Sequence, residues 1–147
     1  SMTVTADYPR SLDEVISDVK YKRETIAALN LFKRSNPWRG TVPVRMEKFR
    51  QLHDALCQIY NVNVSLDFDP SIILNESSGR SNFCPANSTI TLHGRFSVLT
   101  FLHEWGHVLK GRSEHEACKW SVNLFRKIFP VNFERLVANA RGHFLAA

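Results

Sequence analysis

The sequence contains little of what marks several large classes of protein. Its 147 residues include only three Cys, six Gly and six Pro. Three widely spaced cysteines do not make a disulfide framework, and an odd number of them is typical of a reducing compartment. No apolar run approaches the roughly 20 residues that a membrane helix needs, and the first residues lack the apolar segment of a signal peptide. The composition therefore predicts a small cytoplasmic protein that does not associate with membranes.

Charge is distributed unevenly along the chain. The formal net charge is +5, from 19 Lys and Arg against 14 Asp and Glu. Residues 1–50 carry ten of the basic and six of the acidic side chains, so most of the excess lies in the N-terminal third. Such a bias is common on solvated helix faces, and it is also the electrostatic footprint of nucleic-acid binding. Nucleic acid is therefore a candidate partner of this third of the chain.

Helical periodicity dominates the first 60 residues. Apolar residues recur at intervals of three and four over residues 12–32, with a break near 21–23, and again over residues 46–60. Ser11 and Glu14 have the spacing of a capping box at the start of the first run. Residues 35–40 contain Pro and Gly and separate the two runs. We expect two helices here, and a basic helical arm over residues 1–44 followed by a larger domain over 45–147.

The rest of the chain mixes short strands with further helices. Apolar residues alternate with polar ones over residues 62–68 and 89–92, and a third short strand is expected at 72–74. Helical patterns follow over residues 96–109, 113–129 and 133–144. This order predicts an α+β domain in which a small three-stranded sheet is packed with helices.

The sequence HEWGH occupies residues 103–107, inside the helix predicted over residues 96–109. His103 and His107 are four residues apart, which places both imidazoles on one face of a helix, one turn apart. Two imidazoles in this arrangement bind Zn²⁺, which acts as a Lewis acid and lowers the pKa of its water. Glu104 flanks the metal and is the predicted general base. The spacing therefore predicts a zinc site with a catalytic carboxylate.

A zinc site of this kind needs a third protein ligand and leaves a fourth position for water. Glu114, His115 and Glu116 follow the motif closely. Ser113 and Glu116 have the spacing of a capping box, which explains Glu116 without any metal. In the helix predicted over residues 113–129, the apolar residues lie on a face that is nearer to Glu114 than to Glu116. Spacing alone therefore leaves both carboxylates open.

The segment RFSVLTFLHEWGH, residues 95–107, resembles the active-site region of ImmA/IrrE-type metallopeptidases. Members of this family have an Arg-Phe start, an HExGH core and a preceding strand, here residues 89–92. Downstream, the pairs Glu116-Ala117, Trp120-Ser121 and Leu124-Phe125 match the family in type and spacing. The resemblance implies a minimal zincin-like fold and a His-His-Glu zinc site in which Glu116 is the third ligand. In zincins the corresponding strand is an edge strand that can pair with an extended substrate, and the alternative for residues 89–92 is an ordinary strand paired within the sheet.

The resemblance implies a zinc-dependent endopeptidase whose substrate is an intracellular regulatory protein of the repressor type. Two alternatives remain. An SprT-like protease acting on DNA-bound proteins uses a third His after HExxH, here His115, but it follows that His with Gly, whereas Glu116 stands here. The other alternative is a zinc-containing module that regulates or binds DNA without catalysis. The pattern leaves the oligomeric state open.

Overall fold

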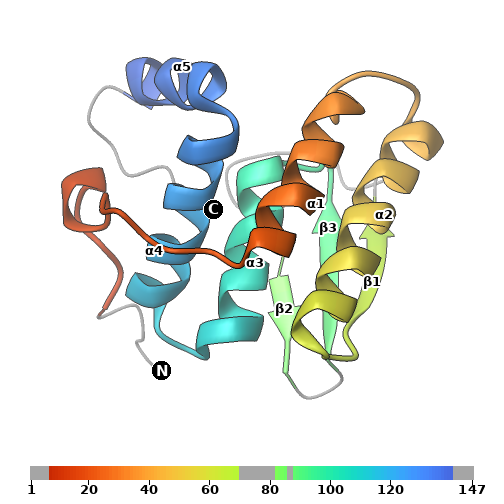
Figure 1. The fold of residues 1–147 in the computed structure, drawn as a ribbon, viewed down its shortest axis with the longest axis horizontal. Helices are drawn as coiled ribbons and strands as arrows, with labels where there is room; N and C mark the ends of the chain where they lie inside the picture. The colour runs from red at the N-terminus through yellow and green to blue at the C-terminus, as the bar shows by residue number, and fades with distance from the viewer. Residues whose placement is uncertain (1–6, 70–81, 86–87, 141–147) are drawn as a thin grey trace. The chain divides into compact units, whose positions relative to one another are not determined.

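The computed structural model describes residues 7–69, 82–85 and 88–140 (Figure 1). In these ranges five α-helices and one short 3-10 helix accompany a three-stranded sheet, which confirms the predicted α+β class. The strand predicted at residues 72–74 lies outside the described ranges. None of the helices described combines the length and the apolarity that a membrane span requires. The chain divides into two compact units. The first is Lys20–Val98, and the second combines Ser1–Val19 with Leu99–Ala147.

The first unit contains a pair of helices, α1 (Arg23–Arg34) and α2 (Val42–Tyr60). The rings of Phe32 and Phe49 pack edge to face between them, with centroids 5.2 Å apart. Helix α2 begins after Thr41, whose hydroxyl accepts a hydrogen bond from the backbone N–H of Val44 in the first turn. It ends at Asn61, whose backbone is left-handed, a conformation that Asn tolerates. The domain boundary predicted after residue 44 falls inside α2, whereas the compact units divide after Val19 and after Val98.

The sheet of this unit has the strand order β1-β3-β2. Strand β1 (Ser65–Asp69) runs parallel to β3 (Thr89–His93), and β2 (Asn82–Cys84) runs antiparallel to it. Ile90 and Leu92 are fully buried, as the predicted alternation requires. Because β3 is hydrogen-bonded on both sides, it is the central strand. The expectation that residues 89–92 form an edge strand open to substrate is therefore wrong.

The second unit contains an N-terminal segment and three helices, α3 (Val98–Lys110), α4 (Glu114–Ile128) and α5 (Pro130–Ala140). The unit takes in α3 from its second residue, Leu99. That segment forms a single 3-10 turn, Leu12–Glu14, in place of the helix predicted from residue 12. Ser11 makes no side-chain cap, and the Glu14 carboxylate accepts a hydrogen bond from the backbone N–H of Arg10 instead. A capping box therefore does not form there.

Helix α4 binds the N-terminal segment through one buried side chain, Asn123. Its amide oxygen accepts a hydrogen bond from the Ser17 backbone N–H at 3.0 Å, and its amide nitrogen donates to the Val15 carbonyl at 2.7 Å. Val15 is itself buried. These bonds satisfy backbone groups that regular secondary structure leaves unpaired. They fix the segment that leads to the candidate site.

Candidate metal centre

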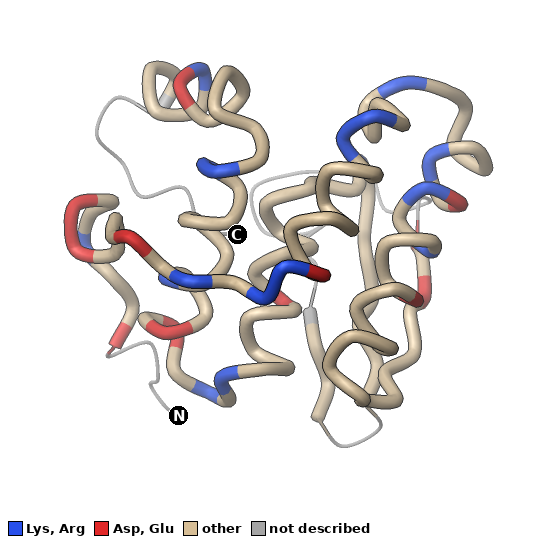
Figure 2. Tube along the Cα trace, in the orientation of Figure 1, with Lys and Arg blue, Asp and Glu red and all other residues tan. Residues whose placement is uncertain are grey.

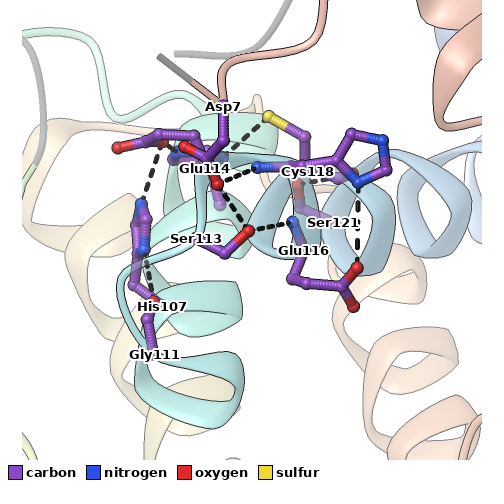
Figure 3. Close-up of polar contacts among 10 residues, drawn as sticks. Asp7, His107, Gly111, Ser113, Glu114, Glu116, Cys118 and Ser121 are labelled. Atoms are coloured by element: carbon purple, nitrogen blue, oxygen red, sulfur yellow. Dashed lines mark hydrogen bonds and ion pairs between the residues drawn. The ribbon is translucent and has the colours of Figure 1, made fainter. Parts of the chain in front are cut away.

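Three side chains of the second unit converge on one point. The Nε2 atoms of His103 and His107 lie 3.0 Å and 3.1 Å from the same carboxylate oxygen, Oε1 of Glu114. The two imidazoles are one turn apart on α3, as predicted, and Glu114 is the first residue of α4. Figure 3 shows Glu114 beside His107 at the start of α4. One nitrogen from each ring and one carboxylate oxygen thus form a group of potential metal ligands within 4.8 Å of one another.

The ring of His107 is oriented by a backbone group. Its Nδ1 lies 2.8 Å from the carbonyl oxygen of Gly111, which follows α3 with φ of +86° as expected for a glycine after a helix. A carbonyl only accepts, so Nδ1 carries the proton and Nε2 of the neutral ring presents a lone pair. That lone pair faces the Glu114 oxygen, which also only accepts when ionised. Two such atoms repel unless a proton or a cation lies between them.

His103 is more deeply buried, with 3% of its surface exposed. Burial lowers its pKa, the nearby His107 lowers it further, and Glu114 opposes both effects. Its Nδ1 lies 3.6 Å from the Cys118 sulfur. Burial raises the pKa of Cys118 to about 12, so this residue stays a thiol at neutral pH. Cys118 therefore supports the ring at Nδ1, while Nε2 stays directed at Glu114.

Glu104, the predicted general base, lies on α3 directly after the first histidine. It is 7% exposed, which is rare for a carboxylate. One residue along a helix is about 100° around its axis, so Glu104 occupies the flank of the face that carries His103 and His107. The predicted pair of imidazoles and the adjacent carboxylate are thus all found on α3.

The third member of the group differs from the one that the family resemblance implies. Glu116 is exposed, and its carboxylate lies 3.7 Å from Nδ1 of His115, outside the group. Its backbone N–H donates to the Ser113 hydroxyl at 3.1 Å, which confirms Ser113 as the N-cap of α4. Residues two apart are about 200° apart around a helix, so Glu114 and Glu116 cannot both face α3. The structure places Glu114 there, on the side to which the apolar pattern of α4 points.

The N-terminal segment reaches the same site, which no sequence pattern predicts. Asp7 accepts a hydrogen bond from the Ser113 hydroxyl at 2.6 Å and one from the backbone N–H of His115 at 3.5 Å (Figure 3). The bond from Ser113 holds the pKa of Asp7 below its usual value. The ring of Tyr8 stacks on His103 with centroids 6.3 Å apart. Asp7 and Tyr8 therefore lie beside the group formed by His103, His107 and Glu114.

Gly106 permits the close approach of α3 and α4. A Cβ atom at this position would lie 2.7 Å from the carbonyl oxygen of Ala117 and 2.9 Å from its Cα. Both are backbone atoms, so rotation of a side chain cannot relieve the contact. The absence of a side chain at Gly106 thus sets the helix spacing that brings Glu114 to the histidines.

This contact predicts the sign of a stability change. Helix propensity alone would make a Gly106→Ala variant more stable by about 1 kcal/mol. We expect the opposite, a loss of about 1–3 kcal/mol in the free energy of unfolding, because the added methyl forces α4 away from α3. Urea denaturation of the metal-free proteins measures the difference. A variant at least as stable as the original chain would show that the spacing does not depend on Gly106.

Comparisons with models of protein families, with curated proteins and with solved structures found no match to this chain.

Proposed function

We propose that this protein is a zinc-dependent metalloendopeptidase whose metal is held by His103, His107 and Glu114. The convergence of two imidazole nitrogens and one carboxylate oxygen carries the proposal. Two His and one Glu form the protein ligand set of several zinc peptidases, in which the fourth position is left for water or substrate. A purely structural zinc site has four protein ligands, and the group described here offers three.

The donor set suits zinc in chemistry and in size. Imidazole nitrogen and carboxylate oxygen are both ordinary zinc ligands, with bond lengths of about 2.0–2.2 Å. Ligand atoms around a tetrahedral ion with such bonds are roughly 3.4 Å apart. The distances of 3.0 Å and 3.1 Å between Glu114 and the two histidines are a few tenths of an ångström shorter. The group as a whole spans up to 4.8 Å, so binding the ion would require an outward shift of Glu114 together with a closer approach of the two imidazole nitrogens.

The chemistry of the reaction divides between the metal and Glu104. When bound, zinc supplies a Lewis acid that polarises the attacking water and the peptide carbonyl group. Glu104 accepts a proton from the water as it attacks the carbonyl carbon, and then donates that proton to the leaving amine as the C–N bond breaks. One water is thereby added across one peptide bond, and Glu104 regains its ionised form.

The proposed substrate is a regulatory protein of the same cell, by the resemblance of residues 95–107 to the ImmA/IrrE-type peptidases. The pair Glu116-Ala117 contributes to that resemblance, although Glu116 lies outside the metal group. The alternative of an SprT-like protease with His115 as third ligand receives no support from the group, because His115 is not part of it.

Cleavage that depends on zinc tests the proposal. Native proteins extracted from the source cells are incubated with the zinc-loaded chain, with the chain treated with a chelator, and with the chelated chain after zinc is restored. We expect new protein N-termini in the first and third samples and none in the second, detected by N-terminal peptide mass spectrometry. New termini in all three samples, or none in any while the chain retains zinc, would contradict the proposal.

A further inference from the structure

The whole positive excess of the protein resides in one short stretch. Residues 31–51 hold six of the 19 Lys and Arg but only one of the 14 Asp and Glu, so thirteen basic and thirteen acidic residues balance in the rest of the chain. This stretch comprises the end of α1, the connecting loop and the first half of α2. In Figure 2 the Lys and Arg positions of this stretch, coloured blue along the trace, lie at this end of the helix pair. The six basic residues are Lys33, Arg34, Arg39, Arg45, Lys48 and Arg50.

Apolar side chains are exposed at the same end of the pair. Four of the six large apolar residues that are exposed in the described ranges lie between residues 31 and 44, namely Leu31, Trp38, Val42 and Val44. A cavity of about 350 Å³ lies between α1 and α2, and Leu31 is the one of these four residues that lines it. Leu31, Phe32 and Leu52 line its apolar part, and Arg34 and Lys48 also line it. Its volume lies in the range of about 300–1,000 Å³ that ligand pockets occupy.

Internal hydrogen bonds fix the shape of this surface. Nζ of Lys48 donates to the carbonyl oxygens of Asn36 and Arg39 at 2.8 Å and 2.7 Å, and Nε of Arg45 donates to that of Pro37 at 2.8 Å. These bonds hold the loop between α1 and α2 to the side of α2. Carbonyl groups carry no net charge, so the bonds leave the positive charges in place. The surface is therefore preformed and electropositive.

We propose that this surface, the cavity between α1 and α2 with the exposed end of residues 31–44, binds an acidic peptide segment of another protein. An apolar side chain of the segment enters the cavity beside Leu31, and flanking carboxylates face Arg34 and Lys48, the two basic residues that line it. Apolar anchors in a preformed pocket supply affinity, and charges around it supply orientation and a faster encounter. The proposal concerns the first unit alone and does not depend on the metal centre.

The aliphatic lining favours a peptide over a nucleic acid. Single-stranded nucleic acids bind by stacking bases on aromatic rings along a basic groove. The apolar residues that line the cavity are instead Leu, Ala and one Phe, Phe32, and they fit an aliphatic or aromatic side chain of a peptide. Glu47, the one acidic residue of residues 31–51, accepts a hydrogen bond from the side-chain amide of Gln51 at 3.2 Å.

A selection from random peptides tests the proposal on the full chain. Phage that display a library of random peptides are enriched on the immobilised protein, and the selected peptides are synthesised with a fluorescent label. We expect the enriched sequences to share Asp or Glu around a Leu, Ile, Met or Phe. Their affinity, measured by fluorescence anisotropy, should fall about tenfold or more in the Leu31→Ser variant and in the Arg34→Glu variant.

Matched substitutions in the other unit serve as controls. Val131 is 62% exposed, as Leu31 is, so Val131→Ser is the control for Leu31→Ser, and Lys127→Glu is the control for Arg34→Glu. Both controls should bind the peptides as the original chain does. The proposal is overturned if no common sequence is enriched, or if the Leu31 and Arg34 variants bind normally. It is also overturned if the two variants still bind the peptides but no longer bind oligothymidylate, which would point to a nucleic acid. The same holds if they still bind the peptides but no longer self-associate in analytical ultracentrifugation, which would point to a second copy of the chain.

Discussion

Replacing Glu114 by Ala is expected to abolish stoichiometric zinc binding, whereas replacing Glu116 by Ala is expected to leave it intact. Oε1 of Glu114 lies within 3.1 Å of both histidine Nε2 atoms, and the Glu116 carboxylate lies outside the group. Loss of a residue that only orients a ligand costs about 10- to 100-fold in metal affinity. Loss of a ligand itself should cost more than that. Elemental analysis after dialysis and titration against a competing chelator measure both quantities.

The two variants form a matched pair. Both glutamates lie in the first turn of α4, so each substitution removes the same charge from the same end of the same helix. Any general effect on α4 therefore cancels in the comparison, and thermal unfolding of the metal-free proteins verifies that both fold. If the Glu116 variant lost zinc and the Glu114 variant retained it, the ligand set implied by the family resemblance would hold and the proposed one would fail.

Local features of the chain could be predicted because their causes are local. The end of α2 at Asn61 and the end of α3 before Gly111 follow from the ease with which these residues adopt positive φ. The N-cap of α4 follows from the Ser113 hydroxyl, which accepts the N–H of a residue three positions on. The arrangement of His103 and His107 follows from the helical repeat alone. Each of these requires no knowledge of distant parts of the chain.

The remaining features depend on contacts between distant residues. Asp7 and Ser113, and likewise Ser17 and Asn123, are 106 positions apart in the sequence, and no local pattern predicts that they bind each other. The rotation of α4 about its axis, which turns Glu114 rather than Glu116 toward the histidines, depends on how α4 packs against α3, where the Ala117 backbone lies close to Gly106. The central place of β3 depends on its pairing with β1 and β2 together. Such choices require the tertiary structure.

Replacing Glu104 by Gln is expected to abolish peptide hydrolysis while zinc binding is retained. Gln has nearly the same shape as Glu, so it fits the buried position on α3, but its amide does not accept a proton from water. General base catalysis contributes about 10²- to 10⁴-fold to such reactions, and the rate of cleavage should fall by a factor of that order. The rate is measured on the protein whose zinc-dependent cleavage is detected first, with enzyme in excess, so that the chemical step is observed.

Two further measurements make the result specific to the role of Glu104. The Glu104→Gln variant should contain as much zinc as the original chain, since the three proposed ligands are untouched. A Glu116→Gln variant makes the same chemical change at an exposed position and should cleave at the original rate. If the Glu104 variant lost zinc as well, the carboxylate would act in holding the metal site. If it retained zinc and cleaved the substrate at the original rate, Glu104 would not be the base, and the proposed division of the chemistry between metal and carboxylate would be wrong.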